Sequence, residues 1–448
     1  MSQHELLVKL EDRLSRPESD LSHLTAEEQH RLILAKVASI PGAVISPDDL
    51  LDRLRTAKKT GCPLRVKFGI DPTGPDIHIG HAVSLINLRL MQRMGHQVVI
   101  VIGDFTGMIG DPSGRSDSRE ALTIEDVHRN MASYEQQAAR IINLRDTAVE
   151  THYNSTWMNR LTMAEWIDLI KKISATALLQ REDFRNRLAA GRGLTMAELE
   201  YALFMAYDSV VLKPDIEIGG IDQYLNMHMC RQMMANEKLQ PEVVITYNLL
   251  AGTTGERDDQ GRLIKMSKSR GNYIPVETPP ADMYGRVMAI PDEVMWIWFR
   301  ELTEITAEEL DALKEKVEDG TIHPKSAKQL LARLVVGTFN RFDATIMREA
   351  EEVFESKFGK AADLVPRDVE TLRVSPEELM LDVLSRVTSK SKSDIRRLVQ
   401  QNGVQLLSAL QYVPLDVSDL SRAAECYPDC VLRIGKRQYF RLVVEKAC

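Results

Sequence analysis

The segment FGIDPTGPDIHIGHAVSLINLRL at residues 68–90 carries a strand, a turn and a helix in quick succession. The turn is rich in proline and glycine, and apolar residues then recur at helical spacing, at Ile79, Ala82, Val83, Ile86 and Leu90. These residues predict a helix with one buried side, and Asp76 is placed to cap its first turn. A strand that leads directly into a helix is the unit of parallel α/β sheets, so the segment predicts an α/β fold.

Two histidines, His78 and His81, stand at the start of this predicted helix. They are three positions apart and share a face at the helix N-terminus, where unpaired backbone N–H groups and the helix dipole attract an anion. Gly80 lies between them and allows a large ligand to approach the backbone. The pattern favours a phosphate or nucleotide site, although an isolated H-x-x-H is more often ordinary polar surface.

A second motif supports the nucleotide hypothesis. The sequence GRLIKMSKSRGN at 261–272 places Lys265, Ser267, Lys268 and Ser269 on a loop with a glycine on either side. Two lysines and two hydroxyls on a mobile loop suit a triphosphate whose charge shifts during reaction. A lysine-rich loop is ordinarily solvated surface, but the two motifs together on one α/β scaffold favour a functional interpretation.

The rest of the chain fits a parallel, doubly wound sheet of the Rossmann-like kind. We expect strands at 65–70, 97–102, 216–220 and 242–250, and a helix from about Thr195 to Val211. Strands that alternate with helices and are followed by glycines indicate a sheet whose ligands bind at the carboxyl ends of its strands.

The chain of 448 residues is too long for one core, and its pattern divides it into five parts. These are a helical extension that we interpret as an appended arm, an α/β domain that carries both motifs, a helical domain in which Ala327, Leu330, Leu331 and Leu334 form one face after Pro324, a linker, and a C-terminal block. Their predicted bounds are 1–60, 61–290, 291–358, 359–375 and 376–448.

Composition points to a cytoplasmic protein that spans no membrane. Residues are 44% hydrophobic and 27% charged, the first residues lack the apolar core of a signal peptide, and the longest aliphatic run, Val98 to Ile102, is too short for a membrane span. The five cysteines lack metal-ligand spacing, except for a single C-x-x-x-C at Cys426 and Cys430, so reduced thiols are expected. The net charge of −8 argues against general nucleic-acid binding, but residues 376–448 carry 11 Lys and Arg against nine Asp and Glu, so a polyanion is expected to bind there.

The two motifs, HIGH at 78–81 and KMSKS at 265–269, resemble the paired signatures of class I aminoacyl-tRNA synthetases. The sequence is most similar to the tyrosyl-tRNA synthetases, strongly over residues 64–292 and more weakly beyond. The similarity rests on FGIDPTGPDIHIGH (68–81), GDFTGMIGDPSGR (103–115), YNS (153–155), YDS (207–209), GGIDQ (219–223) and KMSKS. Near the C-terminus, SKSDIRRLVQQNGVQ (391–405) and LRIGKRQYFRL (432–442) resemble the small α+β RNA-binding module of that family.

The resemblance implies a reaction and a set of groups for ATP. The family joins an amino acid to ATP, which is supplied with Mg²⁺, and transfers the product to tRNA; it uses no tightly bound metal or organic cofactor and is typically a homodimer. The helical domain would bind the anticodon. The catalytic groups would be Thr73, His78, His81, Lys265 and Lys268. The other residues at the ATP site would be Gly80, Gly220, Asp222, Met266 and Ser267, with Asp222 near the ribose.

The resemblance also implies an amino-acid site. Tyr201, Met205 and Asp208 share a helical face, which spacing alone would assign to the core. In the family, Asp208 would bind the phenol hydroxyl, and Tyr201 with Asp111 the ammonium group. The remaining members of the site would be Gly69, Asp71, Met205 and Gln223, of which Gln223 would lie near the substrate carboxylate.

Two positions depart from the family pattern. Met205 stands where a glutamine usually contacts the ammonium group, and methionine is a poor hydrogen-bond acceptor. Lys67 stands where some members place a tyrosine that faces the phenol, although lysine is common in one branch. The first departure bears on the amino acid and leaves the ATP chemistry intact.

Four basic residues in the C-terminal block are candidates for tRNA contact: Arg396, Arg397, Lys436 and Arg437. Scattered solvated charge is the commoner explanation of such residues. Three hypotheses stay open at this point. They are a tyrosine–tRNA ligase, a paralogue that adenylates a related acid for another pathway, and a non-catalytic RNA-binding or regulatory protein, which would have no need to retain both motifs.

Overall fold

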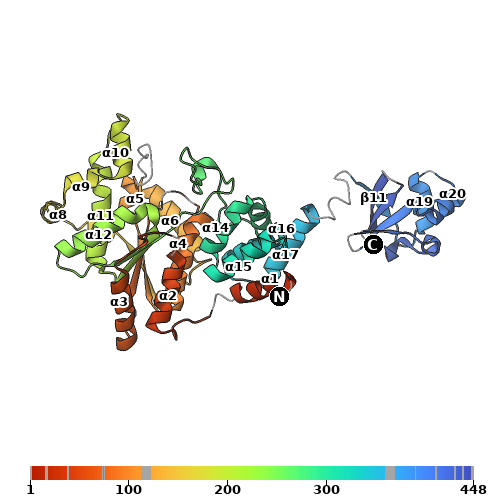
Figure 1. The fold of residues 1–448 in the computed structure, drawn as a ribbon. Coiled ribbons are helices and arrows are strands. Elements are labelled where there is room, and N and C mark those ends of the chain that lie inside the picture. Colours follow the sequence, from red (N-terminus) through yellow and green to blue (C-terminus); the bar gives the residue numbers. More distant parts are fainter. Residues whose placement is uncertain are drawn as a thin grey trace. The chain divides into compact units, whose positions relative to one another are not determined.

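The computed structural model describes residues 3–15, 19–37, 40–72, 74, 76–112, 123–358, 369–388, 390–408, 411–427, 430–435 and 438–444. The chain forms two compact units, Met1–Arg348 and Glu349–Cys448 (Figure 1). No helix among these residues is long and apolar enough to cross a membrane.

A six-stranded sheet forms the centre of the first unit, with the strand order β1-β6-β5-β2-β3-β4. The last five strands in this order are parallel, and β1 pairs antiparallel with β6 at one edge. The strands are β1 (Val44–Ile45), β2 (Arg65–Ile70), β3 (Gln97–Ile102), β4 (Val149–Tyr153), β5 (Ile216–Gly220) and β6 (Val243–Tyr247). The doubly wound α/β prediction is confirmed, and so are the predicted bounds of β2, β3 and β5.

Helices connect these strands. Helix α4 packs on β2, β3 and β5, and α12 packs on β5 and β6. The strand order reverses between β2 and β5, and ligands of such sheets bind at the carboxyl ends of the strands at this point. The helices between β2 and β6 are α4 (Ile79–Arg93), α5 (Thr106–Ile109), α6 (Ile124–Ala138), α7 (Ser155–Met158), α8 (Met163–Ile170), α9 (Ala175–Leu179), α10 (Glu182–Ala189), α11 (Met196–Leu212) and α12 (Tyr224–Asn236).

The first 60 residues are built into this unit, so the interpretation as an appended arm is wrong. They form α1 (Gln3–Leu14), α2 (Ala26–Val37), β1 and α3 (Pro47–Thr60). Strand β1 extends the catalytic sheet, and the buried Gln29 donates a hydrogen bond to the Met94 carbonyl at the end of α4. Arg53 on α3 donates to the carbonyls of Asp215 (3.0 Å) and Pro241 (2.6 Å), beside the starts of β5 and β6. The charged sequence of this segment gave no sign of these long-range contacts.

The predicted helical region after the sheet is confirmed. It contains α13 (Pro280–Met288), α14 (Asp292–Leu302), α15 (Ala307–Glu318), α16 (Pro324–Phe339) and α17 (Ala344–Phe358). Helix α16 begins with Pro324 and buries the predicted face. Helix α1 packs on α16, where Arg333 forms a two-pronged ion pair with Glu11 (2.7 and 2.9 Å).

After α17, the described residues of the second unit form a five-stranded sheet of order β7-β11-β10-β8-β9 and two α-helices, which agrees with the predicted α+β module. Its elements are β7 (Glu370–Val374), α19 (Met380–Thr388), α20 (Lys392–Gln400), β8 (Val404–Ser408), β9 (Gln411–Pro414), β10 (Val431–Ile434) and β11 (Gln438–Val444). Strand β7 lies within the predicted linker 359–375 and pairs in parallel with β11. The module therefore begins earlier than the sequence indicated, because β7 acquires its partner from the far end of the chain.

Arg53 provides a test of how the N-terminal segment is held. We expect Arg53→Met to lower the free energy of unfolding by about 2–3 kcal/mol, because the change removes the Arg53 donor from the Pro241 and Asp215 carbonyls, of which Asp215 keeps the Val243 N–H, and breaks the 3.0 Å ion pair with Asp49. The measurement is urea unfolding of the full chain. The matched control is Arg55→Ala on the same helix, whose pairs with Glu27 and Asp52 are solvent-exposed and should matter little. Equal effects of the two changes would contradict this role of Arg53.

Candidate active site

A cleft of about 490 Å³ lies at the carboxyl ends of β2 and β5. Every predicted ATP and amino-acid residue that the structure describes lines it, whereas Thr73 lies outside the described residues. These lining residues are Gly69, Asp71, His78, Gly80, His81, Asp111, Tyr201, Met205, Asp208, Gly220, Asp222, Gln223, Lys265, Met266, Ser267 and Lys268. One cleft thus joins groups that are separated by up to 199 positions in the chain.

The two histidines stack at the start of α4, with ring centroids 3.6 Å apart. His78 is the N-cap, and its backbone N–H faces the Nδ1 of His81 at 3.4 Å; the prediction that Asp76 caps the helix is therefore wrong. Burial is the main cause that lowers the pKa of His78 to about 4 and the pKa of His81 well below its usual value, and the nearby Lys268 and Lys265 act in the same direction. Both imidazoles are therefore neutral at pH 7.

The segment that follows KMSKS holds the start of α4. The Ile79 N–H donates to the Ile274 carbonyl, and the Val276 N–H donates to the Ile77 carbonyl, each at 2.9 Å. This pairing keeps residues 77 and 78 extended, which explains why the helix starts at Ile79 and not at Asp76. It also brings the HIGH and KMSKS motifs together.

Close packing requires Gly80 at its position. A Cβ atom there would lie 3.0 Å from the His78 ring and 3.3 Å from the Cβ of Met266. The glycine therefore lets α4, the histidine and the loop approach one another.

Asn272 organises the KMSKS loop. Its side chain is buried, accepts a hydrogen bond from the Ser267 N–H (2.8 Å) and donates to the Lys265 carbonyl (3.3 Å). Gly252 lies against it, where a Cβ would come within 2.1 Å of the asparagine Nδ2. These contacts fix the backbone from which both lysines project.

The two lysines of the loop have different surroundings. The Lys265 ammonium forms a 3.0 Å ion pair with Asp222, so two residues predicted for the ATP site are paired in this structure. The Lys268 ammonium lies over Gly74, 3.1 Å from where a Cβ would be. Both cations line the cleft beside the histidines.

The opposite end of the cleft holds acidic groups within hydrogen-bond networks. The Tyr201 hydroxyl and the Thr106 hydroxyl each donate to Asp71 at 2.8 Å. Gln223 donates to Asp111 at 2.6 Å. Met205 lies on α11, lines the cleft and has a half-buried side chain.

Asp208 lies deep in this end of the cleft and is 4% exposed. It accepts hydrogen bonds from the Trp157 indole (2.8 Å) and the Asn154 amide (3.4 Å). Burial raises the pKa of Asp208 to about 7, although Lys67 and these donors pull it down. The carboxyl group is thus poised between its two charge states near neutral pH.

Lys67 lies at the floor of the cleft on β2 and is fully buried. Its ammonium is 2.8 Å from the Glu217 carboxylate and 2.5 Å from the Ser209 hydroxyl, which in turn donates to Glu242 (3.1 Å). The attraction of Glu217 and other buried acids outweighs the cost of burial and raises the pKa of Lys67, so it stays charged. Burial is the main cause that raises the pKa of Glu242 well above its usual value, and the charge of Glu217 adds to it.

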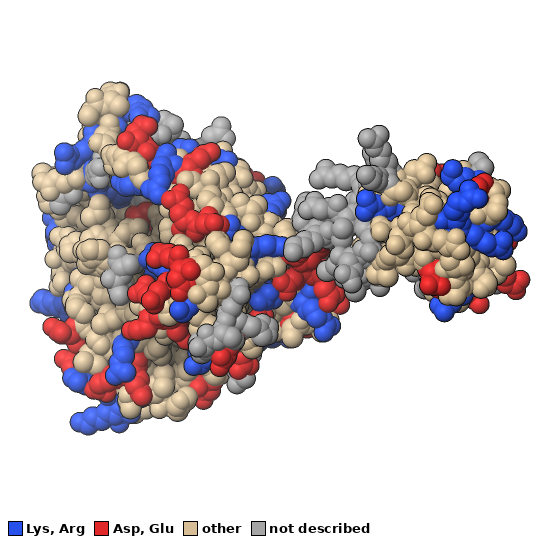
Figure 2. Space-filling model, turned by 45° about the vertical axis from the view of Figure 1, so that its right-hand side comes forward, with Lys and Arg blue, Asp and Glu red and all other residues tan. Residues whose placement is uncertain are grey.

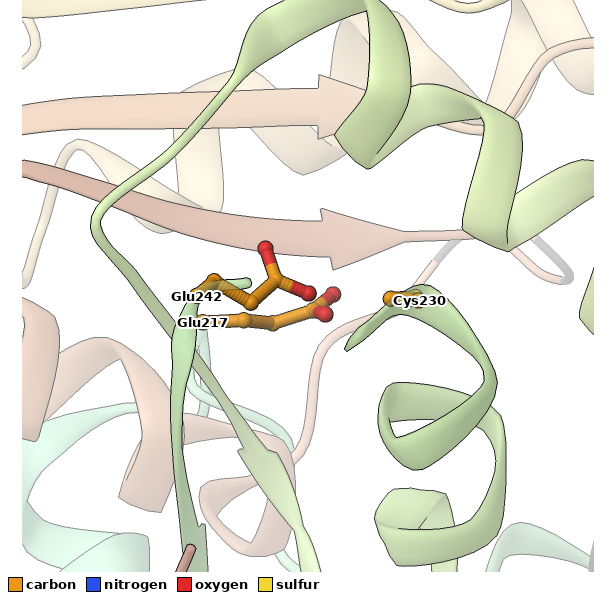
Figure 3. Close-up of side chains that lie close together, drawn as sticks. All are labelled: Glu217, Cys230 and Glu242. Carbon is orange, nitrogen blue, oxygen red and sulfur yellow. The ribbon is translucent and has the colours of Figure 1, made fainter. Parts of the chain in front are cut away.

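Three buried side chains of this network have the spacing of a metal site. Figure 3 shows Glu217, Glu242 and Cys230 close together, and their potential ligand atoms lie within 4.8 Å of one another. The Lys67 ammonium, however, already supplies a positive charge at 2.8 Å from Glu217, and a metal ion beside it would be repelled. The Lys67 ammonium therefore takes the place that a metal ion would have beside Glu217.

Several residues of the site were missed from the sequence. Thr106 lies within the GDFTGMIGDPSGR motif, which offered a signal. Trp157 and Glu217 carry no local pattern, because each acts on a partner from another element. Asn154 and Asn272 lie within the quoted segments YNS and GRLIKMSKSRGN, but these motifs did not reveal that they bind Asp208 and the loop backbone.

The predicted tRNA contacts are only partly described. Arg396 and Arg397 are exposed on α20 of the second unit, and Arg397 is 4.0 Å from Asp394. Lys436 and Arg437 lie outside the described residues.

Comparison with known proteins identifies the family. Residues 58–358 match the family model of tRNA synthetases class I (W and Y). The chain is 38% identical to the tyrosine–tRNA ligase of Desulfotalea psychrophila, over 89% of this chain and 95% of that protein. It is 37% identical to the tyrosine–tRNA ligase of Thermotoga maritima, over 94% of this chain and 98% of that protein. The chain belongs to the tyrosyl-tRNA synthetase family.

Solved structures of this family share the fold. A C-terminally truncated mitochondrial tyrosyl-tRNA synthetase from Aspergillus nidulans aligns with a TM-score of 0.55 at 20% identity and covers 73% of this chain and 99% of its own. The tyrosyl-tRNA synthetase of Archaeoglobus fulgidus, solved with L-tyrosine, aligns with a TM-score of 0.54 at 18% identity, over 73% of this chain and 99% of its own. At these identities the likeness concerns the fold alone.

The role of Asn272 in the synthetase loop can be tested without an activity assay. We expect Asn272→Ala to raise the rate of trypsin cleavage after Lys265, Lys268 or Arg270 by about tenfold, because losing its hydrogen bonds favours local opening by roughly 1–2 kcal/mol. Cleavage sites are read by mass spectrometry. Asn340→Ala removes a comparable side-chain hydrogen bond far from the loop and should leave loop cleavage unchanged. Cleavage of Asn272→Ala at the wild-type rate would show that other contacts hold the loop.

Proposed function

We propose that the protein is a tyrosine–tRNA ligase. It activates L-tyrosine with ATP to give tyrosyl-adenylate and diphosphate, and then transfers the tyrosyl group to the 3′ end of tRNA(Tyr) with release of AMP. The observation that carries this proposal is a single cleft that is lined both by the HIGH and KMSKS groups and by the buried Asp208. We propose that the enzyme acts in the cytoplasm, where ATP and tRNA are both present.

The first step needs positioned cations and donors more than a covalent intermediate. The tyrosine carboxylate attacks the α-phosphate, and negative charge builds up on the departing diphosphate. Neutral His78 and His81 donate N–H groups to phosphate oxygens, while Lys265 and Lys268 bind the diphosphate together with the Mg²⁺ that accompanies ATP. Lys265 first has to leave Asp222, which then becomes available to a ribose hydroxyl.

The amino acid binds at the other end of the cleft. Asp208, in its ionised form, accepts a hydrogen bond from the phenol hydroxyl. A buried group that binds a substrate hydroxyl in this way rejects the analogue that lacks it. Asp71, Asp111 and Tyr201 surround the ammonium group. Met205 adds apolar contact where the family usually offers an amide, and this difference supports one alternative, a paralogue that activates a related acid.

One assay separates the alternatives. Diphosphate exchange into ATP is measured with tyrosine, phenylalanine, and des-amino and β-amino analogues of tyrosine, followed by charging of tRNA. Exchange with tyrosine and charging of tRNA(Tyr) are expected. Exchange with another acid would favour the paralogue, and no exchange would favour a non-catalytic protein.

The phosphate-binding groups give a sharper prediction. His81→Ala and Lys268→Ala should each lower the single-turnover rate of adenylate formation by about a hundredfold, because each removes a donor to developing charge. The unfolding midpoint should change little for Lys268→Ala, since that side chain fills no core volume. His30→Ala and Lys316→Ala, outside the cleft, serve as controls. Wild-type activation rates in both cleft variants would refute the assigned roles.

Contact with tRNA is proposed for the second unit. On the face visible in Figure 2, lysines and arginines gather on this unit, and Arg396 and Arg397 belong to its exposed residues. We expect the double change Arg396→Ala and Arg397→Ala to raise the KM for tRNA severalfold and to weaken its salt dependence, while diphosphate exchange is unaffected. Arg386→Ala, on the same unit but paired with Glu378, is the control. Equal loss of exchange and charging would mean that these arginines act on stability.

A homodimer is proposed from an apolar surface on the first unit. Met163, Ile167, Leu188 and Met196 are 49–73% exposed on α8, α10 and α11, which lie at the same end of that unit (Figure 1). We expect a dimeric mass in sedimentation equilibrium and a monomeric mass for the double change Met163→Glu and Ile167→Glu. Val8→Glu on α1 is the matched exposed control. A monomeric wild type would refute the dimer.

A further inference from the structure

Four side chains form a continuous hydrogen-bonded relay behind the amino-acid end of the cleft. Arg181 donates to the Oδ1 of Asn226 (2.7 Å), Asn226 Nδ2 donates to the Oε1 of Gln223 (2.9 Å), and Gln223 Nε2 donates to the Oδ2 of Asp111 (2.6 Å). The four residues come from four places in the chain. Arg181 precedes α10, Asn226 lies on α12, Gln223 ends the 3₁₀ turn Ile221–Gln223, and Asp111 follows α5.

The chemistry of the two ends sets the direction of the relay. A guanidinium group only donates hydrogen bonds, so Asn226 must turn its oxygen toward Arg181 and its NH₂ group toward Gln223. An ionised carboxylate only accepts, so Gln223 must turn its NH₂ group toward Asp111. The two amides therefore have one orientation that satisfies every contact, and hydrogen bonds in such a chain reinforce one another.

Only half of the relay belongs to the cleft. Gln223 and Asp111 line it, whereas Arg181 and Asn226 do not. Arg181 is 7% exposed and its guanidinium stacks 4.5 Å from the Phe184 ring centre, and Asn226 is fully buried. A charged group and an amide are thus buried behind the pocket wall, where burial is costly unless their hydrogen bonds are satisfied.

We propose that Arg181 is a positioning residue of the amino-acid site, which acts through Asn226 to set the amide orientation of Gln223 and the position of the Asp111 carboxylate. This inference rests on the proposed function, because Asp111 is assigned there to the substrate ammonium. The inference predicts that a change at Arg181 or Asn226, neither of which lines the cleft, weakens amino-acid binding and leaves ATP binding unchanged. A purely structural Arg181, anchoring α10 to α12, predicts no such selectivity.

Asn226→Asp is the decisive variant. The new carboxylate still pairs with Arg181, so the anchor between α10 and α12 is kept, but it cannot donate to Gln223. Gln223 then turns its NH₂ group toward residue 226 and presents its oxygen to Asp111, where two acceptors repel each other. We expect the KM for tyrosine in diphosphate exchange to rise at least tenfold, with the KM for ATP within twofold of wild type and an unchanged unfolding midpoint.

Variants of two arginines complete the experiment. Arg181→Met should also raise the KM for tyrosine. Arg181→Lys retains a donor and should raise this KM less than Arg181→Met does. Arg187→Met is the matched control, because Arg187 is a buried arginine of α10 whose ion pair with Glu198 (2.6 Å) is separate from the relay. It should lower stability and leave the ratio of the two KM values unchanged.

The outcomes separate this inference from the proposed function. The variants are compared on the amino acid that the wild type activates, so a wild type that prefers another acid overturns the tyrosine assignment and leaves the relay testable. A substrate KM within twofold of wild type for Asn226→Asp, or equal rises in the KM for the amino acid and for ATP, would overturn the role of Arg181.

Discussion

The backbone pairing of residues 77–79 with residues 274–276 is the constraint on which the active site depends. Two hydrogen bonds of 2.9 Å join the start of α4 to the segment after KMSKS, across almost two hundred positions of sequence. Without this contact the histidines would still cap a helix and the lysines would still lie on a loop, but they would not face one ligand. The same pairing displaces the helix start from Asp76 to Ile79, so it sets the direction in which His78 and His81 project.

Electrostatics divide the cleft into two ends with different charge. At the ATP end, burial and the charges of Lys265 and Lys268 keep His78 and His81 neutral. These four potential donors therefore carry two positive charges. At the amino-acid end, carboxylates are held largely by neutral hydroxyl and amide donors, as Asp71 is by Thr106 and Tyr201. In the proposed reaction, a triphosphate and an ammonium group would therefore be drawn to different parts of the cleft, which would orient the substrate carboxylate toward the α-phosphate.

The sequence predicted those parts of the fold that depend on local pattern. Strand β3 has the expected bounds because Val98 to Ile102 form a continuous buried run, and β2 is buried at its centre, from Val66 to Phe68. Contacts between distant segments were out of reach: β1 joins the sheet through β6, and β7 depends on β11. The site shows the same division, since family motifs located the residues that line the cleft, whereas partners that orient them, such as Glu217 and Asn226, lie outside those motifs.

Strand β2 shows how one local rule organises the amino-acid end. Side chains alternate along a strand, so Lys67, Gly69 and the following Asp71 project toward the same face. Lys67 supplies the buried cation of the floor, Gly69 leaves space above it, and Asp71 brings a carboxylate to the rim. The lysine has a further effect, because its charge opposes the rise that burial imposes on the pKa of Asp208. With a neutral residue at position 67, Asp208 would be protonated over a wider pH range and would lose its preference for accepting a hydroxyl hydrogen bond. In the proposed function, recognition of the hydroxyl group would thus depend on a cation that need not touch the substrate, and Glu217 makes burial of that cation tolerable.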